Sequence, residues 1–357
     1  MYYLLMNMVQ KDPSAITGTI AKGLGWIINL AFNAVYAFTQ KNSLGISIIV
    51  LTIVVYTLLL PLSAKSQKSM MAMQRLNPEI EKIKKKYGQT KDPELTRKMN
   101  AEIQALYSKH KVNPLGGCLP LIIQMPIFFA LIYLMNQSYL YITHLGNIYY
   151  DLANKIMNDV PHYKNLFLYV FAPHIPKGLN INMDSAHDMV KALSKLTSAD
   201  WAMIFDPNSG LASFDPGGGY AKLATDSNTI EAIHQIFTQK QNIEMFFGLN
   251  LLDRSGWAFP GVIIPILTAG TTFLTSWLST KLTQNSAAPG SGMQQKIMLF
   301  AMPLIMGFFT VNYAAGVGVY WITSSAYRTV QQFFLNKKYR VDSQADSPIE
   351  TKEAKRK

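Results

Sequence analysis

The strongest constraint on how this sequence can fold is a set of five apolar blocks whose cores contain no Asp, Glu or Lys. A helix rises about 1.5 Å per residue and the hydrocarbon core of a bilayer is about 30 Å thick, so roughly 20 apolar residues cross it. Buried helices of a large soluble protein are the alternative, but five such blocks in one chain argue against that class. The sequence therefore predicts an all-α polytopic membrane protein with five transmembrane helices. The blocks are 45–62, 118–135, 257–278, 297–313 and 316–330.

The segments around these blocks predict the domain organisation. We expect an interfacial helix before the first span, a helical hairpin in the cytoplasm and an enlarged extracytoplasmic insertion. The predicted boundaries are 1–43 for the N-terminal extracytoplasmic arm, 44–62 for the first span, 63–115 for the cytoplasmic hairpin, 116–137 for the second span, 138–256 for the extracytoplasmic insertion, 257–280 for the third span, 281–295 for a cytoplasmic loop, 296–313 and 316–334 for the fourth and fifth spans, and 335–357 for a basic cytoplasmic tail.

Residues 16–40 form a two-faced pattern rather than a uniformly apolar block. Polar and interfacial side chains recur at spacings of three and four from Lys22 to Gln40, and apolar side chains from Ile20 to Phe38 fill the opposite face. This pattern predicts a helix that lies in the membrane interface, with a sixth spanning helix as the competing interpretation. The first ten residues have no basic start and no small-residue cleavage site, so we expect no cleavable signal peptide.

Charge is sparse and unevenly distributed along the chain. Only 15% of residues are charged and the net charge is +12, which argues against a disordered chain and against a sequence-specific nucleic-acid binder. Residues 63–115 hold 12 Lys+Arg and 5 Asp+Glu, residues 335–357 hold 7 and 4, and residues 138–256 hold 8 and 11. Because cationic loops stay in the cytoplasm, we expect the N-terminus outside and the C-terminus inside.

The stretch after the first span predicts two antiparallel helices. A mostly apolar seam with spacings of three and four runs from Met73 to Tyr87, and a second seam runs from Leu95 to His110. Lysines on this hairpin and on the tail form either a solvated face that sets orientation or a surface that docks the ribosome, anionic lipid or a nascent chain. The candidate docking residues are Lys82, Lys84, Lys85, Lys86, Lys337 and Lys338.

The outer insertion is long enough for a small domain. Amphipathic helices are expected at 184–197 and 228–247. His187 lies beside Asp184 and Asp188, but no third metal ligand follows at a usual spacing, so we expect no metal site there.

No pattern of catalytic chemistry is visible in the sequence. We find no nucleophile and base pair, no phosphate-binding loop and no dinucleotide motif. The single cysteine, Cys118, excludes an internal disulfide and a cysteine zinc site. We expect neither enzyme activity nor a cofactor.

Polar residues recur inside the predicted spans at helical spacings. Ser and Thr in such helices usually bond their own backbone or a neighbouring helix, so contacts between helices are one interpretation. Gln124 stands between Pro120 and Pro126, and its amide would lack a partner if it faced lipid. The other interpretation is a hydrated groove on which the stripes converge. The candidate groove residues are Thr52, Tyr56, Gln124, Thr268, Thr272, Thr275, Tyr320, Trp321 and Ser324, and Arg328 continues the stripe on the fifth span.

Several motifs resemble the YidC/Oxa/Albino family of membrane protein insertases. The most specific is VNPLGGCLPLIIQMPIF at 112–128, which is similar to the start of the family's second core helix. The resemblance covers about residues 17–137 and 245–340 and fits the bacterial five-span form best. Further similar motifs are Pro61-Leu62 followed by Lys65, Gln67, Ser69 and Met70, then LNPEI at 76–80, MQQKIM at 293–298 and GVYWI at 318–322.

The resemblance implies a function and a mechanism. A hydrophilic segment of the substrate enters a groove that is open to cytoplasm and lipid, and its apolar helix then moves into lipid along the fifth and second helices. No nucleotide is consumed directly, because partition of apolar surface into lipid supplies the driving force. The implied partners are nascent membrane proteins, the ribosome, the Sec translocon or signal recognition particle, and lipids. The implied location is a bacterial cell membrane.

The chain departs from the family pattern at two places. Most bacterial members have an arginine five positions before the proline equivalent to Pro61, where this chain has Tyr56. This difference implies a weaker dependence on the charge of a substrate's tail. The outer insertion is also longer than usual. There are two alternative functions. One is a transporter or channel, but ion-coupled carriers usually have ionisable residues at mid-membrane and inverted repeats, and we see neither in this sequence. The other is a non-inserting assembly chaperone or receptor that acts through its outer domain.

Overall fold

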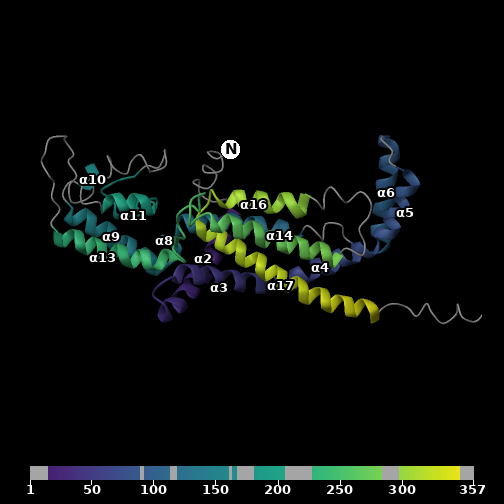
Figure 1. The fold of residues 1–357 in the computed structure, drawn as a ribbon, viewed down its shortest axis with the longest axis horizontal. Coiled ribbons are helices and arrows are strands. Elements are labelled where there is room, and N and C mark those ends of the chain that lie inside the picture. The colour runs from purple at the N-terminus through teal and green to yellow at the C-terminus, as the bar shows by residue number, and fades with distance from the viewer. Residues whose placement is uncertain are drawn as a thin grey trace, which may run out of the picture. The chain divides into compact units, whose positions relative to one another are not determined.

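The computed structural model describes residues 15–88, 92–112, 119–160, 163–166, 181–205, 227–283 and 297–345. Within them the regular structure is helical apart from one short β-hairpin, so the all-α fold class is confirmed (Figure 1). The chain forms two compact units. The first comprises Met1–Thr52, Pro126–Pro265 and Phe309–Tyr320, and the second comprises Ile53–Met125, Ile266–Phe308 and Trp321–Lys357.

The first unit contains the helix that the sequence predicts to lie in the membrane interface, and the segment predicted to be the extracytoplasmic insertion, here called the outer insertion. Its elements are α2 (Ala15–Phe38), most of α3 (Ser43–Leu58), the end of α7 (Leu119–Asn136), α8 (Ser138–Tyr141), α9 (Thr143–Asp159), α10 (Tyr163–Leu166), α11 (Ala186–Leu193), α12 (Ser198–Ile204), α13 (Ser227–Glu244), and the strands β1 (Met245–Phe246) and β2 (Leu249–Asn250).

The second unit contains the hairpin and most of the later apolar helices. Its elements are the end of α3, α4 (Leu60–Arg75), α5 (Asn77–Tyr87), α6 (Pro93–Lys109), the start of α7, most of α14 (Ile263–Thr283), the π-helical segment η4 (Ile297–Ala301), most of α16 (Met302–Thr310) and most of α17 (Ala315–Ala345).

The outer insertion folds around α9. One face of this helix is apolar and buried, including Leu152 and Ile156, and both α11 and α13 pack against it. These two helices lie in the stretches where the sequence predicts amphipathic helices. A capping box starts α12, because the Thr197 N–H donates to Asp200 Oδ2 at 2.7 Å while the Asp200 N–H donates to Thr197 Oγ1 at 3.3 Å.

An ion pair lies inside this core. Lys240 Nζ is 2.7 Å from Glu244 Oε2, and the two side chains are 2% and 1% exposed. The Tyr149 hydroxyl donates to Glu244 Oε1 at 3.0 Å, and Asn250 Nδ2 donates to Oε2 at 3.1 Å. Burial, reinforced by the charge of Glu244, raises the pKa of Tyr149 well above its usual value. These hydrogen bonds offset the loss of hydration that both charges suffer on burial.

Helix α2 packs one side against other helices of the first unit. Ala21, Leu24, Ile28 and Phe32 are buried, and α2 packs against α8. Phe38, on the predicted apolar face, is 91% exposed. Protein therefore covers one side of α2, and the position of this helix in the membrane interface stays a prediction.

A pairing between distant segments holds the start of α17 in the first unit. The Ala315 N–H donates to Asp253 O at 2.7 Å, and the Gly316 N–H donates to Leu251 O at 2.8 Å. A Cβ at Gly316 would lie 3.1 Å from that same carbonyl oxygen, so glycine permits this close approach. The segment before α14 therefore orients the start of α17.

The apolar helices differ in continuity from the five predicted spans. Among the described residues, no single helix is both long and apolar enough to cross a membrane. The segments Ser43–Leu58 and Leu60–Met73 pass that test together, with a bend of 58° between them, while Ile123–Asn136 and Leu299–Thr310 are shorter apolar helices. The number of spans therefore stays a prediction.

The hairpin has the predicted antiparallel arrangement of α5 and α6. Lys86 pairs with Glu102 at 3.0 Å near one end, and His110 lies 4.0 Å from Glu79 near the other. Asp92 caps α6, because its Oδ1 accepts a hydrogen bond of 2.8 Å from the Glu94 N–H.

Candidate functional site

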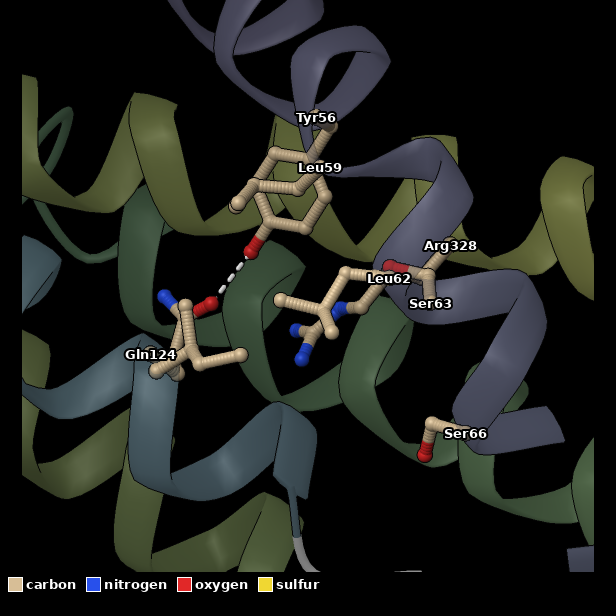
Figure 2. A pocket seen from close by; sticks show the side chains of 8 residues that line it. Tyr56, Leu59, Leu62, Ser63, Ser66, Gln124 and Arg328 are labelled. Carbon is tan, nitrogen blue, oxygen red and sulfur yellow. Dashed lines mark hydrogen bonds between the residues drawn. The ribbon is translucent and has the colours of Figure 1, made fainter. Parts of the chain in front are cut away.

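A small cavity with mixed polar and apolar walls lies within the second unit. It has a volume of about 40 Å³, enough for a few waters that need roughly 10–15 Å³ each. Figure 2 shows the side chains converging on it from α3, α4, α7 and α17. The lining residues are Tyr56, Leu59, Leu62, Ser63, Ser66, Ile123, Gln124 and Arg328.

Two successive helices, α3 and α4, line this cavity on either side of the bend that joins them. Tyr56 lies in the last turn of α3, and Ser63 and Ser66 lie in the first turns of α4, on the far side of the break at Leu59. The sequence predicts one unbroken span over 44–62, and the structure replaces it with this bent pair.

Tyr56 and Gln124 are joined directly. The Tyr56 hydroxyl donates a hydrogen bond to Gln124 Oε1, and both side chains are buried, at 5% and 7% exposure. A buried amide needs such a partner, because an unsatisfied polar group in apolar surroundings is costly. Both interpretations of the polar stripes therefore apply here: the pair links α3 to α7, and it also lines a cavity (Figure 2).

Arg328 reaches the same cavity from α17. Its guanidinium carbon lies 5.9 Å from the centre of the Tyr56 ring. Its Nε donates to Ser324 O at 3.3 Å, and one terminal nitrogen donates to Ser325 Oγ at 3.4 Å. These contacts hold the charged group of a half-buried side chain at the cavity wall (Figure 2).

Further polar contacts bind α17 to the first two helices of this unit. The Tyr327 hydroxyl is 3.0 Å from Thr57 Oγ1, and its ring centre is 5.6 Å from that of Tyr56. Gln67 Nε2 donates to Asn336 Oδ1 at 3.1 Å. These contacts fix α17, and hence Arg328, beside the bend.

The predicted stripe on α14 meets α17 instead of the cavity. Trp321 Nε1 donates to Thr272 Oγ1 at 3.0 Å, and Thr275 Oγ1 lies 2.8 Å from Thr329 Oγ1. Thr268 is fully buried, and its hydroxyl has no hydrogen-bonding partner among the described residues. Two hydroxyls of this stripe therefore contact α17, and a role for the stripe in a groove stays a prediction.

Three other predicted groove residues do not line the cavity. Thr52 and Tyr320 belong to the first unit, and the Thr52 hydroxyl donates to Ile48 O at 2.6 Å within its own helix. Ser324 is buried and its hydroxyl donates to Trp321 O at 2.9 Å. Of the nine candidates, only Tyr56 and Gln124 line the cavity.

The candidate docking lysines differ in their surroundings. Lys82, Lys85, Lys337 and Lys338 are exposed, whereas Lys84 is half-buried. Lys86 is also exposed but pairs with Glu102, and the hydrogen bond and charge of that carboxylate raise the pKa of Lys86 above its usual value. Among the hairpin lysines, the charge of Lys86 is therefore opposed by a carboxylate, while Lys82 and Lys85 are exposed.

The imidazole of His187 lies within hydrogen-bonding distance of a tyrosine hydroxyl. Its Nδ1 is 2.9 Å from the Tyr150 hydroxyl, while Asp184 pairs with Lys164. In the part of the chain that the structure describes, no group of three His, Cys, Asp or Glu side chains is arranged to hold a metal ion.

Sequence reasoning missed several cavity residues for identifiable reasons. Arg328 shares its helical stripe with Tyr320 and Ser324, yet the predicted groove set omits it because it lies at the end of its apolar block. Ser63 continues the polar face of Thr52 and Tyr56, but it and Ser66 fall after the predicted end of the first span at residue 62 and are not in the predicted groove set. The bend at Leu59 has no local signal in the sequence beyond Pro61.

Comparison with known proteins gives a consistent family. Residues 34–205 and 220–343 match the family described as 60Kd inner membrane protein. The chain is 26% identical over 334 residues to the membrane protein insertase YidC 1 of Lactococcus lactis subsp. lactis. This alignment covers 92% of this chain and 83% of that protein.

Two further relatives match over shorter regions. The chain is 50% identical over 94 residues to the membrane protein insertase YidC of Anaeromyxobacter dehalogenans, covering 26% of this chain and 16% of that protein. It is 51% identical over 90 residues to the membrane protein insertase YidC of Fusobacterium nucleatum subsp. nucleatum, covering 25% of this chain and 42% of that protein. These matches span less than two thirds of both relatives.

Proposed function

The chain belongs to the 60Kd inner membrane protein family, and from this premise we propose that it inserts nascent membrane proteins into the lipid bilayer. The observation that carries the proposal is the polar cavity of the second unit, where the Tyr56 hydroxyl bonds Gln124 between otherwise apolar helices. Polar groups within such helices are usually retained for function. A hydrated space there gives the polar segment of a substrate a place that lipid does not offer.

The driving force is the transfer of the substrate's apolar helix into lipid. Hydrophobic partition is favourable by about 25 cal/mol per Å² of apolar surface removed from water, so no nucleotide needs to be consumed directly. The chain contributes a polar cavity that lowers the free-energy barrier to moving the substrate's hydrophilic segment into the membrane. It also contributes an apolar outer surface along which the substrate's helix enters the lipid. Leu304 and Phe308 on α16 are examples of that surface, being 70% and 63% exposed.

The partners follow from this function. The substrates are nascent membrane proteins, and the cationic hairpin and tail face the ribosome, with the Sec translocon or signal recognition particle as further partners. We place the N-terminus outside and the C-terminus in the cytoplasm of a bacterial cell, because the basic segments 63–115 and 335–357 are cytoplasmic under the positive-inside rule.

Insertion by the purified chain tests this function. The full chain is reconstituted in liposomes, a single-span substrate is synthesised in their presence, and protease protection measures insertion against protein-free liposomes. A photoreactive residue at position 56 or 124 is expected to crosslink to a ribosome-held nascent chain. The same probe at the lipid-facing Leu304 is the matched control for mere proximity in the membrane. Insertion no faster than in protein-free liposomes, together with no adduct from a probe at position 56 or 124, would contradict the proposal.

A further inference from the structure

The first unit has an open hollow of its own, between α2 and α8. Its volume is about 390 Å³, against about 40 Å³ for the cavity beside Tyr56. Sites for small organic ligands commonly have volumes of roughly 300–1,000 Å³, so this space is large enough for the polar headgroup of a lipid. The residues that line the hollow are Lys22, Gly25, Trp26, Asn29, Leu140 and Tyr141.

Close packing of the two helices forms the wall of the hollow. A Cβ at Gly25 would overlap the Tyr141 ring, so glycine lets this tyrosine of α8 lie directly on the backbone of α2. Lys22, Trp26 and Asn29 follow one another at spacings of four and three residues along α2. Because such spacings place side chains on one face of a helix, these three line the hollow together.

Asn29 contributes hydrogen-bond donors to the wall. Its Oδ1 accepts a hydrogen bond of 3.0 Å from the Thr143 N–H, at the start of α9. The first N–H groups of a helix have no partner within the helix, so this contact satisfies one of them and fixes the Asn29 amide. The amide nitrogen makes no hydrogen bond to the part of the chain that the structure describes. Its two N–H donors are therefore available to a ligand.

Lys22 gives the hollow a positive charge. This side chain is exposed, and the ion pairs within the described ranges involve other residues. None of the six lining residues is acidic. An ammonium group, the N–H donors of Asn29 and the indole N–H of Trp26 together suit an anion that has several acceptor oxygens, such as a phosphate group.

The surface beside the hollow is apolar, which identifies the source of that phosphate. Trp26, Leu30 and Leu140 are each at least half exposed, and Leu30 lies one turn after Trp26 on α2. A free phosphate ion would leave these side chains in water, whereas the acyl chains of a phospholipid would cover them. Indole rings also favour the level of the lipid headgroups. Polar and apolar parts of a phospholipid therefore both find matching groups here.

We propose that this hollow binds an anionic phospholipid. Lys22 and Asn29 bind the oxygens of its phosphodiester, and its acyl chains lie along Leu30 and Leu140. An anionic headgroup is preferred to a zwitterionic one, because Lys22 repels the cationic group of the latter. This site goes beyond the proposed insertion function, which concerns the cavity of the second unit. The bound lipid contacts both α2 and α8, and so ties the outer insertion to the bilayer surface.

Lipid binding by the full chain in detergent tests this site without requiring insertion. Native mass spectrometry of the delipidated chain measures the Kd for the first molecule of phosphatidylglycerol and, separately, of phosphatidylcholine. The wild type should bind phosphatidylglycerol about fivefold more tightly, as for one lysine close to an anionic lipid. Lys22→Gln should reduce this ratio to about one.

Asn29→Asp is a sharper variant with its own control for folding. The carboxylate keeps an acceptor for the Thr143 N–H but replaces the amide donors by a negative charge. Phosphatidylglycerol binding should weaken about tenfold, as for loss of hydrogen bonds to a charged group, while thermal stability without lipid stays unchanged. Lys41→Gln is the matched control, because Lys41 is an exposed lysine of the same unit that does not line the hollow. It should keep the fivefold preference.

Three outcomes would overturn the proposal. The first is a wild type that binds both lipids equally, or Lys22→Gln and Asn29→Asp variants that keep the preference. The second is displacement of phosphatidylglycerol by an excess of inorganic phosphate, which would assign the hollow to a free anion. The third is tighter binding of phosphatidylcholine that Lys22→Gln does not weaken, which would assign the hollow to a choline group on Trp26 and Tyr141.

Discussion

The indole Nε1 of Trp321 donates a hydrogen bond of 3.0 Å to Thr272 Oγ1, which joins α17 to α14 within the second unit. This contact lies on the helix that carries Arg328, two turns before it. Together with the contacts of Tyr327 and Asn336, it fixes the rotation of α17 about its axis. The position of the cavity cation therefore depends on side chains that do not touch the cavity.

Thr272→Val should loosen that arrangement, because it removes the acceptor of the Trp321 N–H and keeps the side-chain shape. Hydrogen bonds between membrane helices contribute about 0.6 kcal/mol on average and up to about 1.7 kcal/mol. We expect a loss of thermal stability of that order in detergent, measured by unfolding of the purified chain. Thr271→Val is the control, since the Thr271 hydroxyl donates within its own helix to Leu267 O at 2.7 Å. Equal losses in the two variants would contradict this assignment.

Glu244→Gln should destabilise the outer insertion strongly. It removes the charge opposite the buried Lys240 Nζ, 2.7 Å away, and breaking one side of a buried ion pair costs about 3–5 kcal/mol. Limited proteolysis and thermal unfolding of the full chain would report this loss. Asp159→Asn is the control, because Lys155 and Asp159 have the same i,i+4 spacing but are 33% and 38% exposed. If both variants lose the same stability, burial is not the cause.

Because of Lys195, the free energy of unfolding should rise with pH. Its Nζ donates to Asn136 O at 2.8 Å, and burial, with a smaller contribution from Lys191, lowers its pKa to about 8. An unfolded lysine titrates near pH 10.4, so between about pH 8 and 10.4 the unfolded state holds a proton that the folded state releases. The free energy of unfolding should therefore increase across this window.

Thermal unfolding of the wild type, Lys195→Met and Lys191→Met between pH 7 and pH 10.4 checks this prediction. Lys195→Met should lack the increase that the wild type shows. Lys191→Met should keep it but begin it at higher pH, because one neighbouring positive charge is gone. A wild type and a Lys195→Met variant with parallel pH profiles would disprove the prediction.

The cationic surface of the hairpin should act through its unpaired lysines. Replacing exposed Lys82 and Lys85 together by Gln should weaken sedimentation of the chain with ribosomes, and the wild-type interaction should weaken as salt rises. Lys86→Gln should have a smaller effect per charge, because Glu102 already opposes that lysine at 3.0 Å. An equal loss per charge from Lys86→Gln would show that the pairing is irrelevant to docking.

Local patterns in the sequence predicted the helical elements well. The two seams of the hairpin are short-range signals, and α5 and α6 carry most of their positions, although the first seam begins at Met73 on α4. The polar positions of Gln124 and Tyr56 were also recognisable, since a polar group in an apolar block stands out. Helical spacing alone left open whether the stripe on α14 faces a groove or a neighbour.

The sequence by itself determined that the chain is all-α, that its apolar residues are concentrated in blocks, and which positions in those blocks are polar. These properties depend on composition and on spacings of three or four residues. Only the tertiary structure decided that Tyr56, Gln124 and Arg328 share one cavity, because their separation in sequence is bridged by the bend after α3 and by the packing of α17. A charge that is absent from one helix can be supplied by another, and only the packed structure shows where it is placed.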